Sequence, residues 1–160
     1  MKISISFLIM FLITGILSRA QDNSYKPNYS TVLDSSKGKE MLHQCSRRTP
    51  KKVTAFWNLA ESDIQNLELN LKKILSIEPN GWLTFERLKA YTLQYIGIKI
   101  NDKKYIYINA FSSSVNSEVW AANIWKTEPI VVCDGWRGFW GVLFDPGKLE
   151  FSQLEFNGIA

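Results

Sequence analysis

The sequence has 160 residues, of which 46% are hydrophobic and 13% aromatic, so it is long and apolar enough for one domain with a packed core. Its formal net charge of +4 includes Lys2 and Arg19 of an N-terminal leader, and the remaining 17 basic and 15 acidic residues leave +2. This small excess excludes the strongly basic class of nucleic-acid-binding proteins.

Residues 1–20 have the pattern of a secretory signal peptide. Lys2 forms a short positive region, an apolar stretch runs from Ile3 to Leu17, and Ser18 and Ala20 are small residues at the −3 and −1 positions of a cleavage site. We therefore predict a cleaved signal peptide and a periplasmic or extracellular protein. A membrane anchor is the alternative, but the apolar stretch is short for a span. No stable membrane insertion is expected after cleavage.

Residues 21–52 are rich in Asn, Ser, Tyr, Pro and Lys, and Pro27 and Gly38 interrupt any hydrophobic period. Six cations gather here, namely Lys37, Lys39, Arg47, Arg48, Lys51 and Lys52. The composition predicts a weakly structured, solvated basic arm. An arm that attracts anions or binds a partner is the alternative.

A short strand or extended segment over Val53–Trp57 and a helix are predicted next. Ser62 and Gln65 fit a capping box at the start of the helix, and Pro79 marks its end. The apolar residues of this helix recur at spacings of three and four and line one face, which we expect in the core: Ile64, Leu67, Leu71, Ile74 and Leu75.

A long β-hairpin is predicted after the helix. Its strands span Arg87–Ile100 and Lys103–Ala110, joined by a turn at Asn101-Asp102. A two-residue turn places Ile98 opposite Tyr105 and Ile96 opposite Tyr107, and it leaves room at Gly97 beside Ile106.

The C-terminal third is predicted to form three antiparallel strands, after a polar loop over residues 112–117 and a short helix or irregular segment over 118–125. The strands are Ile130–Cys133, Phe139–Phe144 and Leu149–Phe156. Turns at Asp134-Gly135 and Asp145-Pro146-Gly147 separate them. Gly141 marks a place where another backbone or ring comes close. Alternation predicts Phe151 on one face of the last strand and Leu154 and Phe156 on the other.

One helix followed by successive strands indicates the α+β class. We predict a single α+β domain over residues 53–160. In it, one main helix packs across a curved antiparallel sheet of about five strands, an arrangement like that of cystatin-like folds.

Cys45 and Cys133 are the only two cysteines. In an exported chain they favour a disulfide bond, with two separate buried thiols as the alternative. The bond would bring His43, Arg47 and the loop after Cys133 into one neighbourhood. A zinc site has no support, because the chain has one histidine and no close cysteine pair.

His43 and Asp134 are the candidate catalytic residues, as an acid–base pair. We favour the alternative, a surface histidine near a turn aspartate that caps its own loop. No nucleophile elbow, phosphate loop, dinucleotide fingerprint or calcium loop is present. The sequence therefore predicts no cofactor.

The loop after Cys133 supplies the candidate binding residues Asp134, Trp136, Arg137 and Trp140. Trp and Arg are enriched at binding hot spots, and Trp also stacks on sugar rings. The alternative is that both tryptophans pack on the sheet or the arm.

A resemblance adds to these patterns. Val132-Cys133-Asp134-Gly135, Trp140-Gly141-Val142 and Phe156-Asn157-Gly158 resemble a group of small exported bacterial proteins of uncharacterised function. That group tends to have a second glycine after the aspartate, where this chain has Trp136. The resemblance implies the fold and an envelope location, and it implies no activity.

Three functions remain open from the sequence. The first is a secreted or periplasmic non-catalytic binding module for an envelope protein or glycan. The second is a small hydrolase or lyase that uses His43 and Asp134. The third is a structural envelope protein without a ligand. An exposed Trp136 beside Arg137 would favour the first, and burial of all six tryptophans would favour the third.

Overall fold

The computed structural model of this chain describes residues 26–113 and 122–159. The predicted signal peptide, most of the predicted polar loop over 112–117 and the first half of the segment 118–125 lie outside the described residues. Within the described part of 118–125, a single 3-10 turn, η3, covers Ile124–Lys126.

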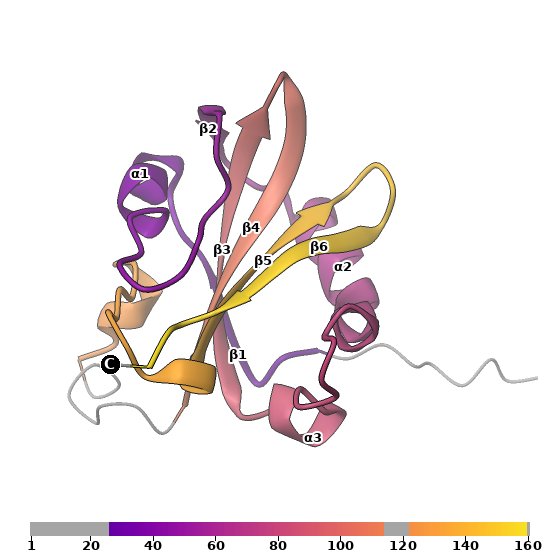
Figure 1. The fold of residues 1–160 in the computed structure, drawn as a ribbon. Helices are drawn as coiled ribbons and strands as arrows, with labels where there is room; N and C mark the ends of the chain where they lie inside the picture. Colours follow the sequence, from indigo (N-terminus) through magenta and orange to yellow (C-terminus); the bar gives the residue numbers. More distant parts are fainter. Residues whose placement is uncertain (1–25, 114–121, 160) are drawn as a thin grey trace, which may run out of the picture.

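The described residues form an α+β fold, as predicted, built on a twisted six-stranded sheet rather than one of about five strands (Figure 1). The strands are β1 (Tyr29–Val32), β2 (Val53–Trp57), β3 (Tyr91–Ile100), β4 (Lys103–Ser112), β5 (Phe139–Asp145) and β6 (Glu150–Phe156). The order is β1-β3-β4-β5-β6. Two strands pair with the same edge of β3. β1 runs parallel to its first half, and β2 runs antiparallel to its second half.

The central hairpin has the predicted register. Ile98 lies opposite Tyr105 and Ile96 opposite Tyr107. Asn101 and Asp102 both have positive φ, 49° and 63°, as a tight two-residue hairpin turn requires. Trp57 of β2 occupies the space beside Gly97. A Cβ atom at position 97 would lie 2.7 Å from the Trp57 ring.

The main helix consists of α2 (Glu61–Asn70) followed directly by the 3-10 helix η2 (Leu71–Ser76). The predicted apolar stripe faces the sheet: Leu67, Leu71 and Ile74 are fully buried, and Ile64 and Leu75 pack at its margin. The helix begins one residue before the predicted cap. Asp63 Oδ2 accepts a hydrogen bond from Ala60 N, so a carboxylate replaces the predicted Ser62–Gln65 box.

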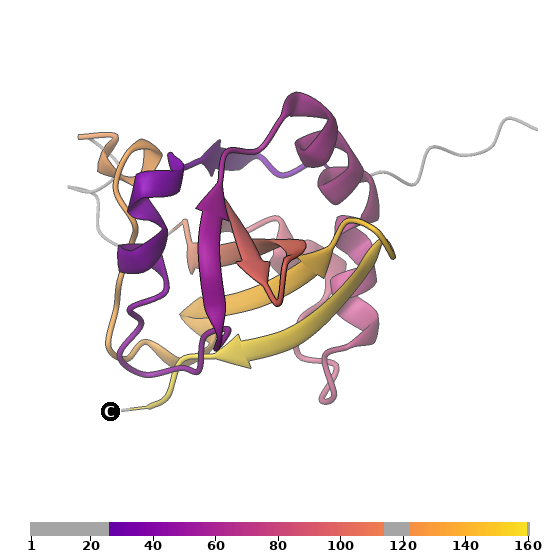
Figure 2. The same cartoon turned by 90° about the horizontal axis from the view of Figure 1, so that it is seen from above.

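The segment predicted as a weakly structured arm is folded over residues 26–52. It contributes β1, the 3-10 helix η1 (Ser35–Lys37) and α1 (Gly38–Met41). In Figures 1 and 2, α1 and α2 lie on opposite sides of the sheet. Leu33 and Met41 are buried against the sheet face that α2 leaves uncovered, which presents Ile96, Ile98, Tyr107 and Leu143. Because β3 and β4 are apolar on both faces, the second face also needs a cover.

Residues 130–133, predicted as a strand, are irregular. Their backbone groups bond to side-chain amides of the sheet and of the residue that follows β6, instead of to a neighbouring strand. Asn109 Nδ2 donates to Ile130 O, and Asn157 Nδ2 donates to Val132 O. The predicted three-strand unit is therefore the β5–β6 hairpin with an extended segment docked beside it.

Two strand predictions change in detail. The strand predicted from Arg87 begins at Tyr91, because Thr84 caps a short helix, α3 (Phe85–Leu88), through a bond from Arg87 N to its hydroxyl. In β6, Gln153 has φ 54° and the pairing with β5 slips. The bulge moves Leu154 and Phe156 to the same side as Phe151, where all three pack on the main core.

Candidate functional site

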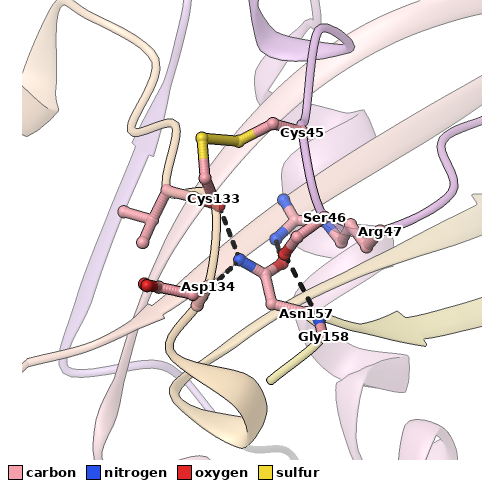
Figure 3. The surroundings of a disulfide bond; sticks show 8 residues. Cys45, Ser46, Arg47, Cys133, Asp134, Asn157 and Gly158 are labelled. Atoms are coloured by element: carbon pink, nitrogen blue, oxygen red, sulfur yellow. Dashed lines mark hydrogen bonds between the residues drawn. A yellow bond between two sulfur atoms is a disulfide. The ribbon is translucent and has the colours of Figure 1, made fainter. Parts of the chain in front are cut away.

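The predicted disulfide is present and joins the N-terminal segment to the segment before β5. Cys45 and Cys133 are bonded, with Cα atoms 4.9 Å apart (Figure 3). The next residue, Ser46, accepts hydrogen bonds from Gly158 N at both its carbonyl (3.0 Å) and its hydroxyl (3.2 Å). Three distant parts of the chain therefore meet at this bond.

Arg47, one of the cations expected on the solvated arm, lies inside the protein, with 8% of its surface exposed. Nε donates to Tyr107 Oη at 3.3 Å, one terminal nitrogen donates to Asn157 Oδ1 at 2.7 Å, and the other donates to Asn109 Oδ1. Figure 3 shows the guanidinium directed at Asn157. Buried polar groups need such partners, because water is not available to them.

The two amides that hold Arg47, together with Gln94, also hold the segment over residues 125–134. Asn109 pairs across the hairpin with Gln94 and donates to its Oε1 at 2.9 Å. Gln94 Nε2 donates to the carbonyls of Trp125 and Glu128, both at 2.7 Å. Asn157 Nδ2 reaches the carbonyl of Asp134 at 2.8 Å. These bonds fix the approach to the candidate loop.

The predicted His43–Asp134 pair is not assembled. Both residues are exposed, and no hydrogen bond joins them. The Asp134 carboxylate points away from Asn157 in Figure 3. His43 lines a separate hollow of about 550 Å³ together with Ser36, Lys39, Glu40 and Val131. In the part of the chain that the structure describes, no group of three or more His, Cys, Asp or Glu side chains could hold a metal ion.

The candidate loop contains one exposed and one buried tryptophan. Trp136 is 47% exposed and begins the 3-10 helix η4 (Trp136–Gly138). Gly135 at φ 83° sets the turn, and Trp136 N donates to Gly158 O at 3.2 Å. Trp140 has no exposed surface and packs edge-on against Tyr91, with ring centroids 5.4 Å apart. Trp140, one of the predicted binding residues, therefore presents no surface to a ligand in this structure, because the pleat of β5 turns it into the core.

Arg137 lies between two tryptophan rings. Its Cζ is 4.5 Å from the ring centre of Trp136 and 5.0 Å from that of Trp82, within the range of cation–π contacts. Arg87 Cζ lies 4.8 Å from the same Trp82 ring. Tyr91 donates from its hydroxyl to the Arg137 carbonyl at 2.5 Å, which fixes the backbone beneath the guanidinium.

Four of these side chains, but not that of Trp136, line a cleft of about 270 Å³, which we call the Trp82–Arg137 cleft. It is lined by Trp82, Arg87, Ala90, Tyr91, Ser112, Arg137 and Gly138. Sequence reasoning found Arg137 but missed Trp82, Arg87 and Tyr91. No local motif marks these three residues. They lie near the loop only because the short helix α3, which was not predicted, precedes β3 and because β3 pairs with β4, which pairs with β5.

The cleft is cationic and aromatic. Two guanidinium groups line it, and no carboxylate does. The nearby Glu78 is buried and accepts bonds from the backbone N–H groups of Asn80, Trp82 and Leu83. Burial raises the pKa of Tyr91 to about 12, so its hydroxyl stays protonated at neutral pH. The arrangement is suited to holding an anion rather than to transferring protons.

No family model, curated protein or solved structure matches this chain. Among the described helices, none combines the length and apolarity needed to cross a membrane. The fold and the geometry of the cleft are therefore the basis of the functional argument.

Proposed function

We propose that this chain is a non-catalytic binding module that works in the periplasm or outside the cell. Its contact surface is the loop at Asp134, Trp136 and Arg137 together with the Trp82–Arg137 cleft. The observation that carries the proposal is the half-exposed indole of Trp136 with the Arg137 guanidinium stacked on it. Such pairs are typical of the few residues that supply most of the free energy of binding.

The loop is held in place before any ligand arrives. The disulfide fixes Cys133, Asn157 bonds to the Val132 and Asp134 carbonyls, and Gly158 O accepts from Trp136 N. Pre-organisation of this kind raises affinity, because less conformational entropy is lost on binding. Residues Cys45–Arg47 therefore help to hold the contact surface in position.

The same bond supports the proposed location. Disulfides form and persist in oxidising compartments, and the predicted leader agrees with export. The partner class remains an envelope protein or glycan, as the sequence indicated.

The two other functions have less support. An enzyme using His43 and Asp134 would need those side chains in contact, and no hydrogen bond joins them, although both lie within two residues of the disulfide. A purely structural protein would be expected to bury its tryptophans, whereas Trp136 is exposed and Trp82 and Trp57 are only half-buried.

A capture experiment tests the binding role. The chain expected after signal cleavage, residues 21–160, carries an N-terminal tag and an intact disulfide and serves as bait for envelope and secreted fractions of the producing organism. A second bait carries Trp136→Ala with Arg137→Ala. The control carries Lys148→Ala with Leu149→Ala, which removes an exposed cation and apolar side chain at the opposite end of β5.

A species held by the unaltered and control baits, and lost with the loop variant, is the expected result. Equal recovery with all three baits would overturn the choice of surface. Recovery of nothing by any bait would overturn the binding role.

A further inference from the structure

Deepening the proposed function, on which this inference rests, we infer that the Trp82–Arg137 cleft is a subsite for a carboxylated sugar ring of an acidic polysaccharide. The carboxylate is received by Arg137 and Arg87, and the ring packs on the indole of Trp136. No acid–base or metal chemistry is involved.

Arg137 has unused hydrogen-bonding capacity. A guanidinium has five N–H donors. Within residues 26–113 and 122–159, the structure gives the Arg137 side chain no hydrogen bond and no ion pair, only the two ring contacts. Arg48 pairs with Glu155, and Arg47 makes three hydrogen bonds. Stacking occupies the faces of a guanidinium and leaves its edge donors available to a planar carboxylate.

The charge of the cleft also favours an anion. Arg87 spends one terminal nitrogen on the Trp82 carbonyl and shares the Trp82 ring with Arg137. Two like charges therefore line one small cleft. The neighbouring acids do not neutralise them, since Glu78 is bound by backbone N–H groups and Glu86 pairs with Lys89. An anion that bridges both arginines relieves their mutual repulsion.

The size and polarity of the cleft favour a sugar over a protein partner. A cleft of about 270 Å³ lies below the usual range of about 300–1,000 Å³ for small-molecule sites, so it takes one ring-sized group. A stable protein interface buries roughly 800 Å² on each partner around an apolar centre. Among the described residues, two other exposed large hydrophobic side chains lie close in sequence to the loop or to Gly158, which contacts it: Val131 and Ile159.

Trp136 supplies the remaining feature. An indole offers a flat apolar face and a polar N–H edge, which suits a pyranose ring with C–H groups on its face and hydroxyls around it. Because Arg137 is stacked on the same ring, a sugar beside Trp136 has its carboxylate within reach of the guanidinium.

Binding of defined polysaccharides tests the inference. The disulfide-bonded chain is titrated with polygalacturonate and with polysialate at about 0.15 M salt, where exposed charges are screened beyond about 8 Å. Tryptophan fluorescence and affinity electrophoresis report binding. The carboxyl-reduced form of each polymer and dextran sulfate are the reference ligands.

We expect the chain to bind at least one carboxylated polymer and to bind its carboxyl-reduced form about tenfold more weakly or worse. Arg137→Gln should weaken binding by about tenfold or more, since a hydrogen-bonded charge contributes on that scale. Trp136→Ala should also weaken binding by about tenfold or more, because it removes the indole on which the ring packs. Lys148→Gln, which removes the same charge elsewhere, should change affinity less than about twofold.

Binding of neither carboxylated polymer would overturn the inference, as would equally tight binding of dextran sulfate that Arg137→Gln leaves unchanged. The proposed function fails separately. The capture experiment could still yield a species whose recovery depends on Trp136 and Arg137 and is not displaced by excess polyuronate. That result would support the proposed binding module and contradict the acidic sugar as its ligand.

Discussion

At the residue scale, Arg47 is the polar centre on which the loop depends. Replacing it by Met leaves the buried Oδ1 atoms of Asn109 and Asn157 without their donor. Each buried group left unsatisfied costs about 1–3 kcal/mol, so we expect Arg47→Met to lower the free energy of unfolding by about 2–5 kcal/mol. Chemical denaturation without reductant measures it.

The neighbouring Arg48→Met is the matched control. Arg48 is exposed and pairs with Glu155 at the surface, so its loss should cost no more than about 1 kcal/mol. Equal losses for the two variants would contradict the role assigned to Arg47.

The same residues show what a sequence can and cannot reveal. Two cysteines in a chain that is predicted to be exported have one way to pair, so the disulfide was predictable. Arg47 was not, because the six cations of residues 21–52 look alike in sequence. Trp136 and Trp140 differ only in whether the local backbone is a turn or a strand. That difference makes one exposed and the other buried.

At the element scale, local patterns predicted β3, β4 and the main helix well. Their periodicity repeats over ten or more residues, and Asn-Asp can take the positive φ values of the turn. The prediction of a strand over residues 130–133 was wrong, because this segment bonds to the side chains of Asn109 and Asn157, which lie elsewhere in the chain. The Gln94–Asn109 pair that begins this network followed from the predicted register, but its role did not.

Glu68 on α2 gives a prediction at this scale. Its Oε1 accepts from Ser30 of β1 and Tyr95 of β3, which ties the helix to the sheet. Burial raises the pKa of this carboxyl above 4.5, so the folded state binds the proton more tightly than the unfolded state. The stability from this group is therefore present at low pH and is lost as the pH rises through the folded pKa.

Glu68→Gln imitates the protonated form. We expect it to unfold at a higher temperature than the unaltered protein at pH 7, and we expect the difference to shrink toward pH 3. Thermal unfolding at several pH values measures this. Glu61→Gln, at the exposed start of the same helix, should show no such gain, because an acid there favours the helix N-terminus. A gain for Glu68→Gln that is independent of pH would contradict the argument.

At the scale of the whole molecule, the fold is a sheet covered on both faces, with each cover serving a different purpose. The main helix closes the larger core, and residues 26–52 close the second face and brace the loop. The class of fold was predictable because helix and strand patterns are local. The second cover was not, since its β1 and α1 are too short to give a periodic signal and become stable only against the sheet.

The disulfide joins that second cover to the loop across 88 positions of sequence. Closing a loop of this length stabilises the folded state by roughly 4–5 kcal/mol in the chain-entropy description. We therefore expect the Cys45→Ser/Cys133→Ser variant to lose stability of that order in chemical denaturation. We expect the sheet to persist, because the hydrogen bonds of Asn157 and Gly158 still hold the segment. Because the disulfide no longer fixes Cys133, we expect Trp136 to become more accessible to fluorescence quenchers.

Reductant separates the bond from the substitutions. It should lower the stability of the unaltered protein to about that of the double variant and leave the variant unchanged. If reductant has no effect on the unaltered protein, the bond contributes nothing to its stability. If quenching of Trp136 is equal in the oxidised and reduced forms, the hydrogen bonds of Asn157 and Gly158 alone position the loop, and the binding surface does not need an oxidising compartment.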